Sequence, residues 1–360
     1  MYKIPCKYCD TKLRVRKFTT GFEYSCPICN GMVYRSGTSA ISVIVMSLST
    51  LIVFFWMIIS DVLTVTLIDT KSRSILDSII ILYQQDYPVS TTIFFVTIVI
   101  IPIVILCLIN LIIFGHQLKI PHRILKKVVY FYENLKNWNM AEVYLIAILI
   151  SMVKLEELTT MQVNIGFWIM LVYIVMFYLT IMWFNPHDIL DIVDIKKKDS
   201  NALFKSTIYL ILALIFIIPS NILPIMPTYK FGVEYNNTIW EGIKILWQDK
   251  DHFIAVVIFF TSICIPIFKI IGVCILILMA KFDILQRYKK LMTIYYRVND
   301  SWGKYSMLDV FVVVIAASFV QFNQLVRIEL GAAIIPFTLV VFFTMMASKS
   351  FDVRLIWEKK

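Results

Sequence analysis

Four cysteines near the N-terminus have the spacing of a metal-binding site. Two CxxC pairs, Cys6/Cys9 and Cys26/Cys29, are separated by sixteen residues. Each pair can present two thiolates from one tight turn, and a spacer of this length can form a hairpin that brings the pairs together. Four thiolates around Zn²⁺ give a closed tetrahedral site, which stabilises a fold and leaves no position open for catalysis. The pattern therefore predicts a zinc ribbon over residues 1–37 with one structural zinc.

Two alternatives for these cysteines remain open from the residues alone. A redox dithiol needs only one CxxC pair, but neither pair is surrounded by the βαβ pattern of thioredoxin-like proteins. Disulfides are disfavoured if the segment is cytoplasmic, as the charge distribution described below predicts. The remaining cysteines, Cys107, Cys264 and Cys274, lie singly in apolar runs and are interpreted as packing residues.

Polar side chains inside apolar runs form a second group of candidates, because an ionisable group near the centre of a membrane helix costs roughly 2.5–3.5 kcal/mol. Lys269 lies in the middle of such a run, three residues after Pro266. Ser262 lies two helical turns earlier, on the same predicted face. Asp309 and Glu142 each begin an apolar run and could pair with Lys269 or exchange protons with it. The predicted transport network comprises Lys269, Asp309, Glu142, Ser262, Ser306, Thr344 and Lys154.

Each of these positions also has a purely structural interpretation. The two acids can lie at the headgroup level, and Lys269 can reach the interface or satisfy a neighbouring carbonyl. Lys154, which is followed by two glutamates, fits an interfacial anchor as well as a site. The choice depends on where the membrane-spanning elements place the side chains.

Eight apolar runs are long enough to position these side chains in a bilayer. With 59% hydrophobic and only 16% charged residues, the chain of 360 residues has too little polar surface for a soluble protein. A helix needs about 20 residues to cross. We therefore expect an all-α integral membrane protein with about eight transmembrane helices. The predicted spans are 40–60, 87–115, 140–158, 158–186, 206–229, 252–280, 306–326 and 330–348.

The basic residues predict the orientation of these spans. Of the 34 Lys and Arg residues, 26 fall on the face that carries both termini and 6 fall on the other face. Basic loops favour the cytoplasm, so both termini are predicted to be cytoplasmic. This rule accounts for the net charge of +10 without a nucleic-acid partner. The polar N-terminal segment does not resemble a cleavable signal peptide.

The apolar region contains an internal duplication. The segment 138–143 resembles 305–310 at an offset of 167 residues, and 101–103 resembles 265–267 at an offset of 164. The matches predict two parallel four-span repeats, related by an axis along the membrane normal. The predicted domains are the ribbon at 1–37, the first repeat at 38–190, a cytoplasmic linker at 191–205 and the second repeat at 206–360.

Three segments resemble a known protein family. They are Trp302–Val313 (WGKYSMLDVFVV), Ser350–Trp357 (SFDVRLIW) and Ile218–Met226 (IPSNILPIM). They are similar to the paraquat-inducible protein A family, and the resemblance covers nearly the whole chain. It implies a bacterial inner-membrane protein that passes phospholipids to or from a periplasmic tunnel protein built of MCE domains. One departure is that the second cysteine ribbon common in this family is absent from 187–205.

The leading hypothesis is therefore an inner-membrane component of an MCE-type intermembrane lipid transport system, for which coupling to ions or protons stays an open alternative. Neither the phosphate-binding GxxxxGK[ST] motif nor GxGxxG nor HExxH occurs, so the chain is not predicted to be an enzyme. Two other functions stay open. One is a redox or stress-response membrane protein that uses the CxxC pairs, and the other is a membrane anchor that holds the partner without transporting lipid.

Overall fold

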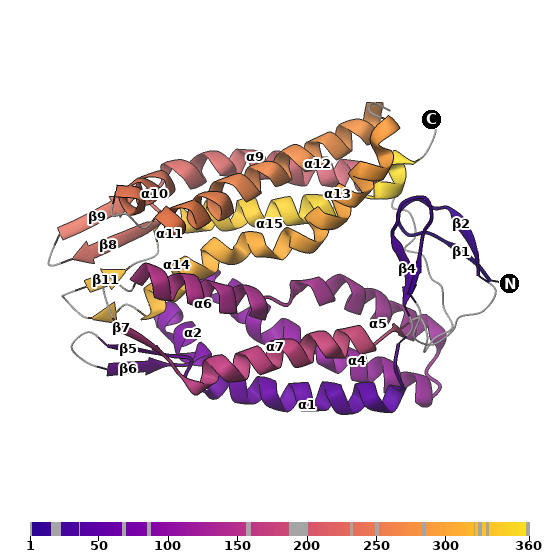
Figure 1. The fold of residues 1–360 in the computed structure, drawn as a ribbon, viewed down its shortest axis with the longest axis horizontal. Coiled ribbons are helices and arrows are strands. Elements are labelled where there is room, and N and C mark those ends of the chain that lie inside the picture. Colours follow the sequence, from indigo (N-terminus) through magenta and orange to yellow (C-terminus); the bar gives the residue numbers. More distant parts are fainter. Residues whose placement is uncertain are drawn as a thin grey trace.

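The molecule is an elongated bundle of apolar helices with small sheets at one end and two cysteine hairpins at the other (Figure 1). A computed structural model describes residues 2–15, 23–35, 37–66, 70–84, 88–155, 160–186, 201–230, 233–248, 252–282, 286–319, 321–322, 326–328 and 331–357. We call residues 37–186 the first half and residues 201–357 the second half.

The first half alternates long apolar helices with shorter connecting helices. Ser39 caps its first helix, because its side chain accepts a hydrogen bond from the Ser42 amide at 3.3 Å. The helices are α1 (Ala40–Ile59), α2 (Ile75–Gln84), α3 (Pro88–Phe95), the π-helical turn η1 (Val96–Ile100), α4 (Ile101–Gln117), α5 (His122–Leu135), the 3₁₀ turn η2 (Lys136–Trp138), α6 (Ala141–Leu155) and α7 (Ile165–Trp183).

The second half repeats this order of helices, with two additional 3₁₀ turns, η4 and η6. Its helices are α9 (Ala202–Ile222), α10 (Ile239–Gln248), α11 (His252–Ile258), the π-helical turn η3 (Phe259–Cys264), α12 (Ile265–Phe282), the 3₁₀ turn η4 (Gln286–Tyr288), α13 (Lys289–Trp302), the 3₁₀ turn η5 (Gly303–Met307), α14 (Leu308–Phe319), α15 (Ile334–Ser350) and the 3₁₀ turn η6 (Val353–Ile356). In both halves a π-helical turn directly precedes Ile-Pro, at Pro102 and Pro266. Proline removes one amide donor and crowds the preceding turn, which a π-helical turn accommodates.

A three-stranded and a four-stranded antiparallel sheet form what we call the strand end of the bundle. Each sheet takes its strands from one half, and each joins the connection after that half's first long helix to the connection before its last. The first sheet has the order β6 (Thr70–Arg73), β5 (Leu63–Thr66), β7 (Thr160–Val163). The second has the order β10 (Gln321–Phe322), β11 (Val326–Ile328), β8 (Met226–Lys230), β9 (Val233–Asn237).

Five described helices are long and apolar enough to cross a membrane: Ala40–Ile59, Ser90–Gln117, Ile165–Trp183, Ala202–Ile222 and Ser262–Phe282. The predicted spans 140–158 and 330–348 coincide with shorter apolar helices, and 306–326 coincides with α14, which has 12 residues. The expectation of an all-α fold thus holds for the bundle but omitted the sheets. β7 and β8 occupy the ends of two runs that the sequence predicted to be helical, 158–186 and 206–229.

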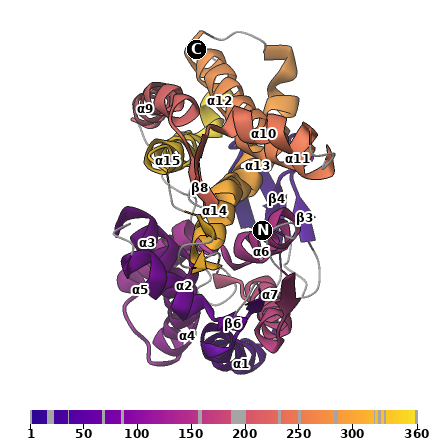
Figure 2. The same cartoon turned by 90° about the vertical axis from the view of Figure 1, so that its left-hand side faces the viewer.

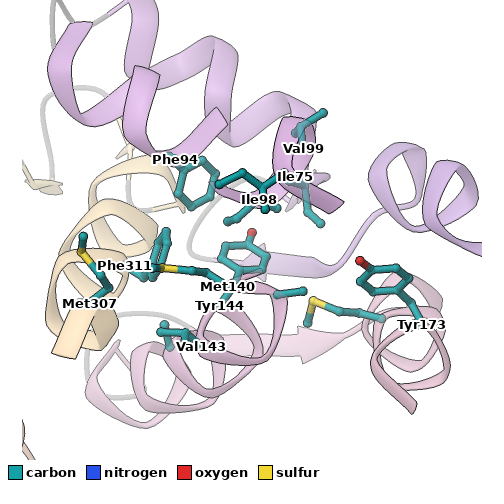
Figure 3. Packing of buried hydrophobic residues seen from close by; sticks show 14 of the residues in the cluster. Ile75, Phe94, Ile98, Val99, Met140, Val143, Tyr144, Tyr173, Met307 and Phe311 are labelled. Carbon is teal, nitrogen blue, oxygen red and sulfur yellow. The ribbon is translucent and has the colours of Figure 1, made fainter. Parts of the chain in front are cut away.

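The two halves pack against each other through α6 and α14 (Figure 2). At this contact the Phe311 ring of the second half lies 5.5 Å from the Phe94 ring and 6.5 Å from the Tyr144 ring of the first half, between centroids. Figure 3 shows these three rings facing one another. All three are at most 2% exposed, so one continuous core spans both halves.

Candidate functional site

The N-terminal cysteines form two matching turns at the ribbon end, the end of the bundle opposite the sheets (Figure 1). The hairpins are β1 (Tyr2–Pro5) with β2 (Lys12–Val15), and β3 (Glu23–Ser25) with β4 (Met32–Arg35). In the first turn the Asp10 amide donates to the Cys6 carbonyl at 2.9 Å, and in the second the Asn30 amide donates to the Cys26 carbonyl at 2.8 Å. Asp10 and Asn30 both have positive φ, of 58° and 55°. Asp and Asn are among the side chains that best tolerate this backbone region.

The four thiols fit a single metal ion. Their sulfur atoms all lie within 4.8 Å of one another, with Cys6 to Cys29 at 3.5 Å and Cys9 to Cys26 at 3.6 Å. Ligands about 2.3 Å from a tetrahedral Zn²⁺ would be about 3.8 Å apart. Burial raises the pKa of Cys6 and of Cys29, so these thiols need a nearby cation to lose their protons at neutral pH. All four cysteines are free thiols in this structure.

The cysteine turns dock on the second half of the chain. The guanidinium of Arg297, on α13, donates to the Asn30 carbonyl at 2.8 Å and lies 5.3 Å from the centre of the Tyr8 ring. The Trp357 ring packs against the cysteine cluster, and its indole N–H donates to the Thr293 hydroxyl at 3.0 Å. The ribbon that precedes the first half is therefore held by elements of the second half.

Lys269 is the charged residue of the predicted network whose surroundings are most fully described. It lies on α12, is 4% exposed, and donates from its Nζ to the Gly303 carbonyl at 2.8 Å. Asp300 is close enough to interact with it electrostatically. These groups line a small pocket together with Asn299, Met345, Ser348 and Lys349. The Lys269 ammonium thus lies beside the connection between α13 and α14.

Three other residues of the predicted network, Glu142, Thr344 and Ser262, do not line this pocket. Glu142, on α6, accepts a short hydrogen bond from the Tyr178 hydroxyl. Thr344 is buried and donates to the Val341 carbonyl at 2.9 Å. Ser262, in the π-helical turn η3, lines a second small pocket with Ser220, Asn221 and Pro266. The side chains of Lys154, Ser306 and Asp309, and residues 191–200 of the predicted linker, lie outside the described part of the chain.

Sequence reasoning missed Ser348 and three further polar residues that line the Lys269 pocket, namely Asn299, Asp300 and Lys349. These three lie in segments assigned to the cytoplasmic side, whereas the predicted network consists of polar residues in or beside apolar runs. Lys349 also lies 4.4 Å from the centre of the Trp138 ring, so it contacts the first half. The duplication offered one signal, because Asp300 is equivalent to Glu133 at the offset of 167.

Comparisons with known proteins place the chain in a family. The sequence model described as paraquat-inducible protein A matches residues 42–194 and 203–360. The chain belongs to the paraquat-inducible protein A family. No solved structure gives a significant match.

Three relatives are similar to this member of the paraquat-inducible protein A family over almost their full lengths. Intermembrane transport protein PqiA of Escherichia coli K12 is 25% identical, over 99% of this chain and 96% of its own. A probable intermembrane transport protein of Haemophilus influenzae is also 25% identical, over 99% and 95%. The lipophilic envelope-spanning tunnel protein A of E. coli K12 is 21% identical, over 98% and 90%.

The family and the apolar helices together establish a multi-pass membrane protein whose relatives are named for transport. The predicted family membership is confirmed. The four cysteines lie close enough together to hold a metal ion, as the CxxC spacing predicted.

Proposed function

We propose that this chain is the inner-membrane component of an MCE-type intermembrane lipid transport system. It passes phospholipids between the inner membrane and a periplasmic tunnel protein. The observation that carries the proposal is similarity over almost the whole chain to relatives named as intermembrane transport proteins and as an envelope-spanning tunnel protein. Those names imply work between two membranes. The choice of a periplasmic tunnel protein as the partner rests on the family resemblance.

The proposed membrane unit consists of two tandem four-span repeats, 38–190 and 206–360, with both termini in the cytoplasm. The repeated order of helices, π-helical turns and strands supports it, and the family matches divide between residues 194 and 203. The basic residues predict which segments are cytoplasmic. Where the structure describes these segments, they lie at the ribbon end, opposite the strands (Figure 1). The strand end would then face the periplasm and the tunnel partner.

Lys269 is the proposed coupling residue within the membrane. Its ammonium is buried, and the Gly303 carbonyl and the charge of Asp300 compensate it. A lysine binds phosphate as a compact point charge, so an entering phospholipid headgroup could exchange with these partners. The proposed network also contains Glu142, Asp309, Ser262, Ser306, Thr344 and Lys154.

The test is replacement of Lys269 by alanine in cells that depend on this protein for lipid transport. We expect Lys269→Ala to abolish complementation at an unchanged level of protein in the membrane. Lys281→Ala is the matched control, because Lys281 lies on the same helix but is exposed. Full complementation by Lys269→Ala would reject the role of Lys269 and would favour a membrane anchor that holds the partner without moving lipid.

Zinc is the proposed occupant of the cysteine site, bound by Cys6, Cys9, Cys26 and Cys29. Elemental analysis of the purified chain should give one zinc per molecule, and Cys29→Ser should lose most of it, because three ligands leave an open site. Thiol titration before and after oxidant separates this from the redox alternative. A metal-free chain whose thiols oxidise and recover reversibly would support the redox function instead.

A further inference from the structure

Two helices at the ribbon end each expose an apolar seam that neither the metal site nor the Lys269 pocket uses. On α5 the seam consists of Ile124 and Phe131, which are 53% and 51% exposed. On α13 it consists of Leu291 and Val298, which are 57% and 48% exposed. The members of each pair are seven residues apart, or about two turns, so each pair lies on one helix face.

The two seams occupy equivalent positions in the duplication. The offset of 167 that relates Glu142 to Asp309 also relates Ile124 to Leu291 and Phe131 to Val298. The same offset places a basic residue before each seam, Arg123 and Lys290, and both of these side chains are exposed. An exposed apolar pair next to a cation therefore occurs twice at the same place.

The length of the following helices sets the depth of these seams. α6, which follows α5, has 15 residues, and α14, which follows α13, has 12 residues. At about 1.5 Å per residue these helices measure about 22 Å and 18 Å, and both fall short of the roughly 30 Å of a hydrocarbon core. If the chain crosses at these points, the segments that adjoin α6 and α14 have to cover the remaining depth, and these segments include η2 and η5 and the ends of α5 and α13.

Packing places the two helices at that depth. The Tyr295 hydroxyl, on α13, donates to the Phe268 carbonyl at 3.0 Å, and Phe268 lies inside the candidate span Ser262–Phe282. On α5, Leu125 packs against Gly115, which lies near the end of the span Ser90–Gln117. A Cβ added at Gly115 would lie 2.8 Å from the Cδ2 atom of Leu125. Both helices thus run back along a spanning helix.

We propose that the seams of α5 and α13 insert into the cytoplasmic leaflet at the boundary between headgroups and acyl chains, and that Arg123 and Lys290 bind the phosphates of anionic phospholipids there. Apolar residues buried at that boundary and cations at the headgroups are the two contributions to binding of an amphipathic helix. The two helices make the protein sensitive to the anionic lipid content of one leaflet. This inference rests on the membrane location and not on lipid transport.

The test is photocrosslinking in the full-length chain in lipid nanodiscs. The photoreactive residue p-benzoylphenylalanine replaces Phe131 or Val298, and the adducts are identified by mass spectrometry. We expect phospholipid adducts at both positions. Lys126, exposed on the far side of α5 from the seam, is the matched negative control, and Leu111, 48% exposed on the spanning helix α4, is the positive control.

Lipid composition tests the cationic part. In discs that mix phosphatidylethanolamine with phosphatidylglycerol, adducts at position 131 should be enriched in the anionic lipid, and Arg123→Gln should reduce that enrichment by about fivefold, the effect of one cation near such a surface. Lys290→Gln should do the same at position 298. The proposal is overturned if Leu111 yields lipid adducts while positions 131 and 298 yield none, if position 126 yields as many, if protein adducts replace lipid adducts, or if enrichment survives both substitutions.

Discussion

Two glycines at the N-terminal ends of the apolar helices α7 and α15 permit the same close backbone approach in each half. The Gly166 amide donates to the Asp61 carbonyl at 3.0 Å, and the Gly331 amide donates to the Ile225 carbonyl at 2.9 Å. A Cβ at Gly166 would lie 2.5 Å from the Asp61 carbonyl oxygen, and one at Gly331 would lie 2.2 Å from the Pro224 carbonyl oxygen. Since backbone cannot move aside as a flexible side chain can, only glycine fits either position.

We expect Gly166→Ala and Gly331→Ala each to destabilise the protein by about 1–3 kcal/mol, the usual cost of an overpacked contact. Gly242→Ala is the matched control, because an added Cβ there meets no atom within 4 Å and alanine is favoured in a helix by about 1 kcal/mol. Thermal unfolding in detergent measures all three. An unchanged melting temperature for both Gly166→Ala and Gly331→Ala would contradict the close approach.

The element that connects the metal site to the membrane is α13. Its Arg297 holds the Asn30 carbonyl beside the cysteine turn, and its C-terminal end leads directly to Gly303, whose carbonyl accepts the hydrogen bond from Lys269. One helix therefore contacts the ribbon at one point and adjoins the buried ammonium at another. The C-terminal segment Ser350–Trp357, which carries part of the family resemblance, also contacts the ribbon. Its Trp357 packs on the cysteines, and its Arg354 guanidinium pairs with Asp352 at 2.6 Å.

We expect Arg297→Ala to accelerate removal of zinc by a chelator about tenfold, because a hydrogen bond from a charged group contributes about 1.5 kcal/mol. Arg287→Ala is the control, since Arg287 is exposed on η4. The measurement is the rate at which a colorimetric chelator takes up zinc from the intact chain in micelles. Identical rates for the two variants would show that docking does not protect the metal.

The sequence predicted the helical bundle and the cysteine cluster better than it predicted the ends of the spans. The CxxC spacing determined the cluster, because each pair needs only a local turn. The strand Met226–Lys230 was read as part of a helix, because an apolar run has the same composition in a buried strand as in a helix. The helix before this strand contains Pro219 and ends at Ile222, two residues before Pro224.

The polar pocket could not be assembled from sequence, because its members come from three separate elements. Asp300 and Asn299 belong to α13, Lys349 to α15 and Lys269 to α12. Hydropathy assigns the first three to the water side. The fold of α13 back along α12 brings Asn299 and Asp300 to the level of Lys269, and the last turn of α15 brings Lys349 there.

At the scale of the whole molecule, aromatic rings of the described residues join the halves at two places, and at one of them the Trp138 ring lies 6.1 Å from the Phe342 ring. Phe311 of α14 lies against Phe94 and Tyr144 of the first half, and all three rings are buried (Figure 3). Ser151 adds a hydrogen bond of 3.4 Å to the Val312 carbonyl. These residues are apolar or neutral, so the attraction between the halves is mainly packing.

We expect Phe311→Ala to destabilise the protein by about 3–5 kcal/mol, the range for removing a buried aromatic ring. Phe268→Ala should cost far less, because the Phe268 side chain is 65% exposed. Chemical unfolding in micelles compares the two. Equal losses would show that the contact between the halves contributes no more than an exposed ring.

The ribbon and the two sheets differ in whether they contact one half of the chain or both halves. Each sheet pairs strands from the loops of a single half. The ribbon precedes α1 of the first half and contacts α13 of the second half, so it connects the two halves. Because no strand of one sheet pairs with a strand of the other among the described residues, a separation of the halves at the strand end would break no strand pairing. At the ribbon end the same separation would break the hydrogen bond between Arg297 and Asn30.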